Sequence, residues 1–193
     1  MASINPIRIL LAGSSHTRLF FPFIESCLEG IAVVARLPCY AGRTDEILNS
    51  LTEWPLEGQD VVHVYSGHRD LMLNDDGLPF VNPGMFERNL RRIIEMLSSL
   101  TNAKIVFSNI PPVADSILRR DSGRNHRIIH YNRIINYVAG DSGVPVHDFY
   151  GFALRYQGGA SKYLDGVHFS REFYREFGRN LSDYLIKIAP PRG

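Results

Sequence analysis

The sequence predicts an α/β protein, a three-layer α/β/α sandwich around a five-stranded parallel sheet. Five short apolar runs alternate with segments in which apolar residues recur at helical spacing. Strands that are separated by helices require parallel crossover connections, and these place helices on both faces of one sheet. The length of 193 residues, without an internal repeat, suits one domain that spans residues 1–193.

The strands and helices can be placed in order along the chain. A proline suits the first turn of a helix, where its missing N–H costs no hydrogen bond, so we expect Pro22 and Pro83 each to open one. Thr44 is of the type that caps a helix. The expected strands are residues 7–11, 31–35, 61–65, 104–108 and 144–149. The expected helices are residues 22–29, 44–51, 83–100 and 124–138, with a loop at 111–123 and a last helix from Ser170.

Composition and charge exclude several classes of protein. Lys and Arg total 21 and Asp and Glu total 20, a net charge of +1 that excludes binding of nucleic acid by bulk charge. No apolar run approaches the roughly 20 residues that span a bilayer, and residues 1–6 lack the pattern of a signal peptide. Cys27 and Cys39 form no CxxC pair. We therefore expect a cytoplasmic, reduced protein with no nucleic-acid or membrane partner.

Polar residues with catalytic chemistry follow the expected strands. In a parallel α/β sheet the site lies beyond the carboxyl ends of the strands. Four segments occupy such places: residues 13–17 (GSSHT), 40–44 (YAGRT), 66–71 (SGHRDL) and, just before the last helix, 165–168 (DGVH). They supply a hydroxyl, a glycine amide, cationic donors and an acid three residues before an imidazole. These are the parts of a serine hydrolase: a nucleophile, oxyanion donors, a base and an orienting carboxylate.

Serine-based catalysis explains these residue types. A serine hydroxyl is a weak nucleophile, so Ser15 needs a neutral imidazole to accept its proton. Asp165 and His168 are close enough in a turn for the carboxylate to hold one ring nitrogen, which leaves the other to face Ser15. A glycine such as Gly42 lets a backbone N–H approach a developing oxyanion without a side chain in the way.

Four segments resemble, in order, the sequence blocks of the SGNH or GDSL hydrolase family. Residues 9–17 resemble the first block, a strand followed by G-D-S-x-T, residues 40–44 the second, residues 61–71 the third, a strand followed by G-x-N-D, and residues 165–168 the D-x-x-H of the fifth. The resemblance covers nearly the whole chain and implies the flavodoxin-like SGNH hydrolase fold. It also implies that Ser15 is the nucleophile, His168 the base, Asp165 its orienting acid and the Gly42 amide an oxyanion donor.

Two positions depart from the pattern of that family. Ser14 stands where the first block has aspartate, and Arg69 stands where the third block has the asparagine that helps to bind the oxyanion. An arginine is longer, always charged and offers five N–H donors. Three roles stay open for Arg69: an oxyanion donor, a site for an anionic substrate group, or an ion pair with Asp70 or another acid.

Each motif also has a purely structural interpretation. Ser15 alone would be read as a helix cap, and Ser14 is a competing candidate nucleophile. His126 and His130 lie four residues apart on an expected helix, but no third ligand has suitable spacing, so a solvated face and no metal are expected. The arginines before and at the start of that helix form either a solvated loop or a rim that attracts anions. They are Arg119, Arg120, Arg124 and Arg127.

The residues favour an ester hydrolase, a short-chain carboxylesterase or O-deacetylase that acts through an acyl-enzyme on Ser15. Its partner would be a small-molecule ester, neutral or anionic, and it needs no cofactor. Three alternatives stay open: an acyltransferase with the same site, a non-catalytic ligand-binding module suggested by Arg69, and a flavodoxin-like phosphate binder that uses Ser14, Ser15 and Thr17. The residues indicate no particular oligomeric state.

Overall fold

The protein is built on a parallel β-sheet. The computed structural model describes residues 5–38, 42–158 and 162–191. Within them the strands are β1 (Ile7–Gly13), β2 (Ala32–Arg36), β3 (Val61–Tyr65), β4 (Lys104–Ser108) and β5 (Val146–His147). Their order across the sheet is β2-β1-β3-β4-β5, and every neighbouring pair is parallel. This arrangement confirms the predicted fold class.

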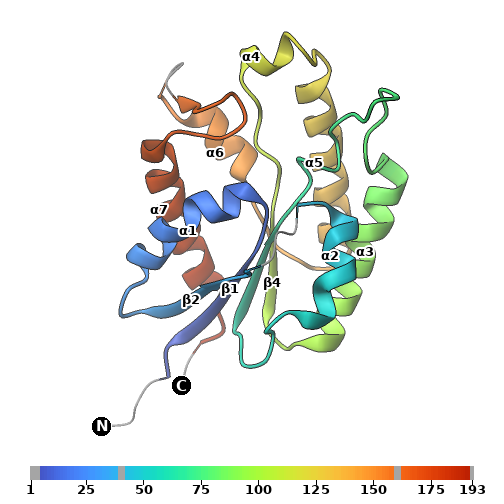
Figure 1. Cartoon of the computed structure of the whole chain (residues 1–193). Helices are drawn as coiled ribbons and strands as arrows, with labels where there is room; N and C mark the ends of the chain where they lie inside the picture. The colour runs from blue at the N-terminus through green and yellow to red at the C-terminus, as the bar shows by residue number, and fades with distance from the viewer. Residues whose placement is uncertain (1–4, 39–41, 159–161, 192–193) are drawn as a thin grey trace.

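Helices cover both faces of the sheet (Figure 1). They are α1 (Ser15–Cys27), α2 (Thr44–Ser50), the 3-10 helix η1 (Leu51–Glu53), α3 (Pro83–Leu100), α4 (Asp115–Leu118), α5 (Arg124–Asp141), α6 (Phe149–Arg155) and α7 (Arg171–Ile188). One face carries α1, α6 and α7, and the other carries α2, α3 and α5. In the part of the chain that is described, no helix is long and apolar enough to cross a membrane.

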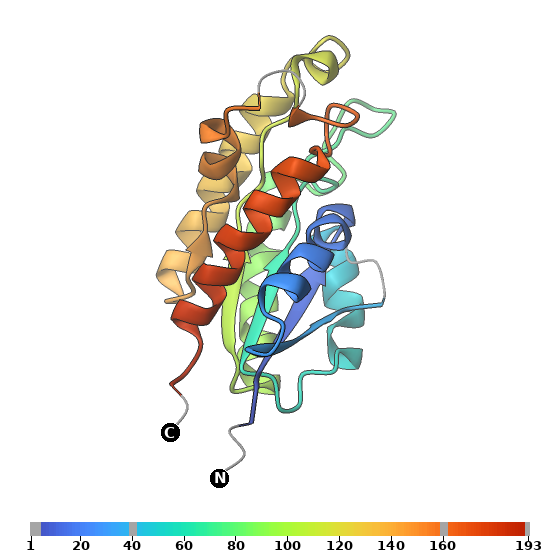
Figure 2. The same ribbon diagram turned by 90° about the vertical axis from the view of Figure 1, so that its left-hand side faces the viewer.

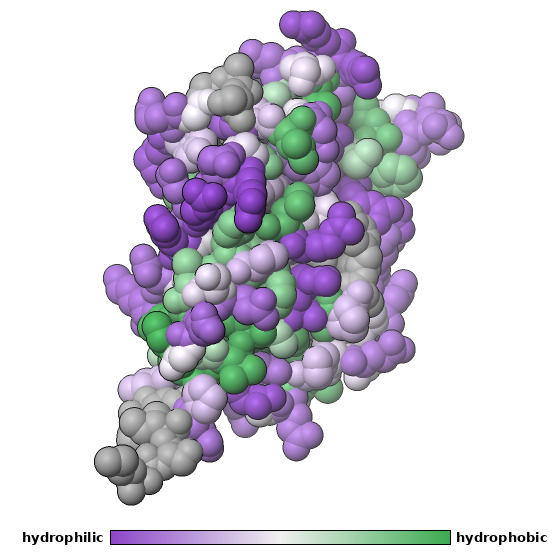
Figure 3. Space-filling view, turned by 60° about the vertical axis from the view of Figure 1, so that its left-hand side comes forward, coloured by the Kyte–Doolittle hydropathy of each residue, from purple (hydrophilic) through white to green (hydrophobic). Residues whose placement is uncertain are grey.

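Alternate residues of the strands fill two separate cores. Leu10 belongs to a core shared with α2, α3 and α5, while Ile9 and Leu11 belong to one shared with α1, α6 and α7. Successive side chains of a strand point to opposite faces, which explains the division. On the side of α1 and α7, apolar side chains also reach the surface (Figure 3), among them Ile31, which directly precedes the edge strand β2.

The register of the sheet brings two of the predicted site loops together. β1 pairs in parallel with β3, and Gly13 at the end of β1 lies opposite Tyr65 at the end of β3. The strands approach so closely here that a Cβ on Gly13 would collide with the Tyr65 carbonyl oxygen. The segments that begin at Ser14 and Ser66 therefore leave the sheet side by side at its carboxyl edge, where such folds place their sites.

The first helix begins earlier than the sequence indicated. The expectation that Pro22 opens this helix is wrong, because α1 begins at Ser15 and Pro22 lies inside it. A proline in a helix interior removes one backbone hydrogen bond and usually disfavours the helix. Packing decides here, since α1 buries His16, Phe20 and Ile24 along one face. Tertiary contacts often override local helix propensity in this way.

The last strand is shorter than predicted. β5 covers Val146–His147 only, although the apolar run at residues 144–149 suggested a longer strand. The Asp148 side chain accepts a hydrogen bond from the Gly151 amide and thereby caps α6, a helix that the sequence did not indicate. The chain consequently turns from strand to helix at Asp148, and Phe149 begins α6.

Two smaller elements also differ from expectation. Thr44 is the first residue of α2 rather than its cap, a position that Arg43 occupies. The predicted loop at residues 111–123 contains the single-turn helix α4. By contrast, Asn82 caps α3 by accepting a hydrogen bond from the Met85 amide, and the prediction that this helix opens at Pro83 is confirmed.

Candidate active site

Ser15 lies where a parallel α/β sheet places its site. It is the first residue of α1, just beyond β1, and its Oγ lies 2.7 Å from Nε2 of His168. Ser14 occupies the N-cap position, yet its side chain makes no capping hydrogen bond. The Oγ of Ser14 is buried and has no hydrogen-bond partner within the described residues. Of the two candidate serines, Ser15 is thus the one that faces an imidazole.

Asp165 holds the other side of that imidazole. Its Oδ2 lies 2.6 Å from Nδ1 of His168, and its Oδ1 accepts the backbone N–H groups of Val167 and His168 at 2.9 and 2.7 Å. Burial acts to raise the pKa of Asp165, but the hydrogen bonds from His168 and Val167 outweigh it and lower that pKa below its ordinary value. An ionised carboxylate can only accept, so Nδ1 carries the proton and Nε2 is left to face Ser15.

A constrained turn carries this pair. Tyr163 and Phe169, on either side of Asp165 and His168, form an antiparallel β-bridge that closes the turn. Gly166 at its centre has φ of +89°, a conformation that favours glycine because L side chains rarely adopt it. The turn therefore fixes the three-residue spacing that the sequence predicted for the acid and the imidazole.

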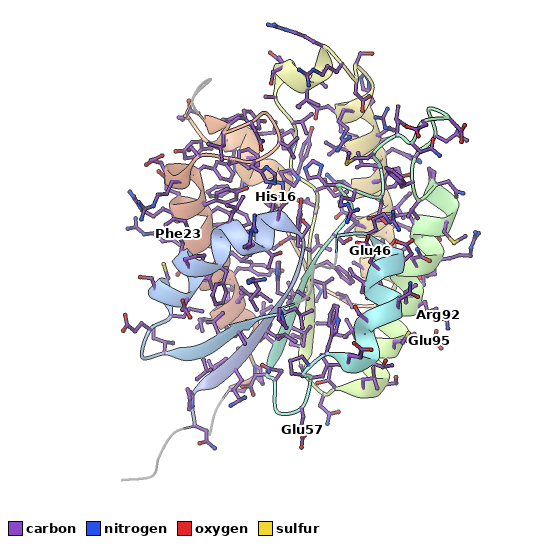
Figure 4. All side chains as sticks on the ribbon, in the orientation of Figure 1. His16, Phe23, Glu46, Glu57, Arg92 and Glu95 are labelled. Atoms are coloured by element: carbon purple, nitrogen blue, oxygen red, sulfur yellow. The ribbon has the colours of Figure 1, made fainter. Side chains whose placement is uncertain are left out.

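The two predicted oxyanion donors, the Gly42 amide and Arg69, both contact the carboxylate of Glu46. The backbone N–H groups of Gly42 and Arg43 both donate to Glu46 Oε2 at 3.0 Å. Nη1 of Arg69 lies 3.1 and 3.2 Å from the two oxygens of the same carboxylate. Of the three roles considered for Arg69, the structure shows the ion pair with an acid. The acid is Glu46 rather than Asp70. Glu46 stands in the first turn of α2 (Figure 4), at the position where a capping box reaches back to the N-cap.

Asp70 connects the loop after β3 to the start of α2. It is fully buried and its Oδ1 accepts the backbone N–H of Thr44 at 2.9 Å and the Thr44 hydroxyl at 2.5 Å. The Thr44 hydroxyl in turn accepts from the Asn89 side chain at 3.0 Å. Burial raises the pKa of Asp70 to about 6, against the lowering effect of the bonds from Thr44. Asp70 thus has a structural place, because it fixes the segment next to Gly42.

Two buried histidines stand beside the Ser15–His168 pair. The His16 ring (Figure 4) lies 5.1 Å from the His168 ring and is stacked on the His68 ring at 5.3 Å. Burial, followed by the charge of His168, lowers the pKa of His16 to about 3. Burial also lowers the pKa of His68 well below its usual value. Both rings are therefore neutral at pH 7, and sequence reasoning gave neither a role.

Two of the four arginines predicted to lie in a solvated loop or rim are structural instead. Arg124 is buried and donates to the carbonyl oxygen of His68 at 3.3 Å. Arg127 donates to the carbonyl oxygen of Leu71 at 3.1 Å and forms an ion pair with Asp121. Both side chains therefore anchor the loop after β3 to α5.

A cavity of about 710 Å³ lies beside the acid of the site. Its walls are residues 112–116, which include the first two residues of α4, and residues 162–166, which include Asp165. Leu154 and Asn125 complete the lining, so that both apolar and polar side chains face the space. A cavity of this size is in the usual range for small-molecule sites.

The pair of histidines on α5 lies at the surface. His126 and His130 are both exposed. Among the residues that the structure describes, no three His, Cys, Asp or Glu side chains are grouped so as to hold a metal ion. This placement agrees with the solvated helix face that their spacing suggested.

Solved structures share this architecture. A lipase/acylhydrolase from Enterococcus faecalis superposes with a TM-score of 0.78 at 22% identity, over 97% of this chain and 99% of that chain. An acetylxylan esterase from Geobacillus stearothermophilus gives a TM-score of 0.76 at 14% identity, over 97% of each chain. Another acetyl xylan esterase gives 0.77 at 17% identity, over 93% of this chain and all of the other. At such identities these likenesses establish the fold.

The sequence also matches a family model. None of the curated proteins compared with the chain matches it. Residues 33–176 match the model of the GDSL-like lipase/acylhydrolase family, a match that covers most of the chain and begins after Ser15. The predicted resemblance is thereby confirmed at the level of the family. The chain belongs to the GDSL-like lipase/acylhydrolase family and is an ester hydrolase.

Proposed function

We propose that the protein is a serine esterase that hydrolyses short acyl esters through an acyl-enzyme on Ser15. One observation carries the proposal: Ser15 Oγ, the two ring nitrogens of His168 and Asp165 Oδ2 form a continuous series of contacts at 2.7 and 2.6 Å. These are the distances at which a nucleophile, a general base and an orienting carboxylate act together. No metal or organic cofactor enters this chemistry.

The proposed reaction has two halves. Ser15 Oγ attacks the ester carbonyl carbon while its proton passes to Nε2 of His168. The imidazolium then gives that proton to the departing alkoxide oxygen, the C–O bond breaks, and the acyl group remains on Ser15. In the second half, water attacks the acyl carbon as His168 takes one of its protons. That proton returns to Ser15 Oγ when the carboxylic acid leaves, and Asp165 stabilises the imidazolium in both halves.

The oxyanion of the tetrahedral intermediate needs N–H donors. The Ser15 backbone N–H lies at the N-terminus of α1, where the first amides of a helix have no partner in that helix. The partial positive charge of the helix end favours an anion at this place. We propose the Ser15 amide as the principal donor. The Gly42 amide is a second donor, and its N–H would donate to the oxyanion and to Glu46 at the same time. Arg69 forms an ion pair with Glu46, so its positive charge neutralises that carboxylate near the oxyanion instead of acting on the oxyanion by itself.

The substrate we propose is a neutral ester with a short acyl group such as acetyl. The charge of Arg69 is compensated within the protein, which removes the main reason to expect an anionic substrate. Two of the structural neighbours described above are acetylxylan esterases.

The test is hydrolysis of a p-nitrophenyl ester series from acetate to octanoate, together with an acetylated sugar, using Ser15→Ala to define the background. We expect kcat/KM to be highest for the acetate and to fall with acyl length. A wild-type protein no faster than Ser15→Ala on every ester would contradict the proposal. Such a result would favour a non-catalytic ligand-binding module on the same fold.

Glu46→Gln should change the charge preference of the enzyme. Glutamine preserves the capping box but removes the negative charge that compensates Arg69. We expect kcat/KM for p-nitrophenyl succinate, an anionic ester, to rise about fivefold relative to p-nitrophenyl acetate, as loss of an ion pair worth about 1 kcal/mol implies. The ratio of the two values is the measurement. An unchanged ratio would show that Arg69 lies too far from the acyl group to sense its charge.

A further inference from the structure

Tyr174 on α7 links the neighbours of the two reacting residues. Its hydroxyl lies 2.7 Å from Nδ1 of His16 and accepts the backbone N–H of Phe169 at 3.3 Å. His16 directly follows Ser15, and Phe169 directly follows His168. Tyr174, His16 and Phe169 are each no more than 2% exposed. The connection is therefore shielded from water, and water does not compete for it.

The Tyr174 hydroxyl can hold both groups at once. A tyrosine hydroxyl has one hydrogen to donate, and its oxygen already accepts from the Phe169 amide. Its oxygen has two lone pairs, so the 2.7 Å contact with Nδ1 of His16 forms with either neutral tautomer: the hydroxyl donates to an unprotonated Nδ1 or accepts from a protonated one. Burial keeps His16 neutral, with its pKa lowered to about 3.

A second contact fixes α1 against α7. The two helices lie side by side (Figure 2), and Gly178 stands one turn after Tyr174 on α7. A Cβ on Gly178 would lie 2.7 Å from Cβ of Phe23 on α1, so the absence of a side chain permits close packing. Tyr174 and Gly178 therefore hold the first turn and the middle of α1 at a defined separation from α7.

We propose that Tyr174 is a positioning residue whose hydroxyl sets the separation of Ser15 Oγ and His168 Nε2. This inference rests on the proposed function, because it assigns Tyr174 a part in the same Ser15 chemistry. Ser15 and His168 lie 153 residues apart and belong to different helix starts, so their distance depends on how α1 sits against α7. The Tyr174 hydroxyl acts on the residues next to both, and it touches neither the substrate nor the reacting atoms.

Tyr174→Phe tests the proposal with a matched control. The variant keeps the ring and removes one oxygen, and we expect kcat for the short ester to fall about 10- to 100-fold with KM within about twofold, since a 1 Å misplacement costs about that much. Tyr131→Phe also removes one buried hydroxyl, which donates to the Val81 carbonyl oxygen at 2.6 Å on the other face of the sheet. We expect this control to lower the melting temperature in a similar way but to leave kcat within about twofold of wild type.

Two further readouts keep the test decisive. In the wild-type protein, ¹⁵N NMR of the His16 ring should show a neutral imidazole at pH 7 whose Nδ1 shift changes in Tyr174→Phe, and an Nδ1 shift that stays the same in the variant would overturn the hydrogen bond directly. A Tyr174→Phe kcat equal to wild type, or an equal loss in Tyr131→Phe, would overturn the positioning role. Failure of the proposed function looks different, because the wild type would then show no turnover beyond that of Ser15→Ala.

Discussion

Ser15→Ala and His168→Ala should each lower kcat for a short acyl ester by about 10⁶-fold. The two side chains act as one unit, since Ser15 Oγ attacks only while Nε2 of His168, 2.7 Å away, accepts its proton. Asp165→Asn should cost about 10⁴-fold, because an amide in place of the carboxylate favours the wrong tautomer of the imidazole. Steady-state kinetics on p-nitrophenyl acetate, with KM measured alongside, is the appropriate test.

The double variant Ser15→Ala/His168→Ala gives a sharper form of this test. If the residues work as one unit, the double variant loses no more activity than either single variant, whereas independent contributions would multiply. Ser14→Ala is the matched control, because it removes the adjacent hydroxyl, which makes no capping hydrogen bond. We expect that variant to keep kcat within a few-fold of wild type. Loss of activity in Ser14→Ala with retention in Ser15→Ala would reverse the assignment of the nucleophile.

The second large effect should be a steep loss of stability in mild acid. Burial lowers the pKa of His16 and of His63 to about 3, and it lowers those of His68 and His147 as well. In the unfolded chain each returns to the ordinary pKa near 6.5. Between these values the unfolded state binds protons that the folded state does not. The free energy of unfolding is therefore unaffected by these histidines above pH 6.5, and it falls as the pH falls towards 3.

The size of the effect follows from proton counting. Each such histidine contributes a slope of about 1.4 kcal/mol per pH unit, so His16 and His63 alone give about 3 kcal/mol per unit below about pH 5.5. Asp70 opposes them, because burial raises its pKa to about 6 and the folded state then binds its proton first. Between pH 6 and pH 4 the proton that Asp70 binds in the folded state offsets the destabilising effect of about one histidine. From pH 6.5 to pH 4 the two histidines cost about 7 kcal/mol and Asp70 returns about 3 kcal/mol, so the free energy of unfolding should fall by about 4 kcal/mol, a large part of the roughly 5–15 kcal/mol of a typical domain.

Urea denaturation at intervals from pH 7 to pH 4 would measure this dependence. His63→Gln removes one titrating group and should flatten the slope by about 1.4 kcal/mol per pH unit. Glutamine can still reach the Ser108 hydroxyl, which lies 2.7 Å from Nε2 of His63. His126→Gln, on the exposed face of α5, is the control and should leave the slope unchanged. A His63→Gln slope equal to that of wild type would mean that His63 is protonated in the folded protein.

Much of the fold was predictable because its strands are locally distinctive. β3 and β4 coincide with the predicted ranges, since each is a short segment rich in apolar β-branched or aromatic residues between polar turns. The start of α1 was missed because Pro22 looks like the beginning of a helix, whereas burial of the preceding residues against α7 decides the outcome. α6 was not predicted because residues 144–149 were interpreted as one strand, and Asp148, which caps this helix, falls inside that range.

The candidate site was predictable where its chemistry lies in short motifs at strand ends. Ser15, Asp165 and His168 were chosen by residue type, order and place, and the structure brings them together. The contact of Glu46 with Gly42 could have been found from the capping-box spacing. The contact of Tyr174 with His16 had no such signal, because it joins residues 158 positions apart and leaves no periodic pattern.

The separation of the nucleophile and its base along the chain also affects the protein during synthesis. Ser15 lies near the beginning of the sequence, and His168 follows 153 residues later. At translation rates of about 5–20 residues per second, roughly 8–30 s pass between the synthesis of Ser15 and that of His168. The Ser15–His168 pair therefore forms only after nearly all of the described fold has been synthesised, so the proposed nucleophile and its base come together late.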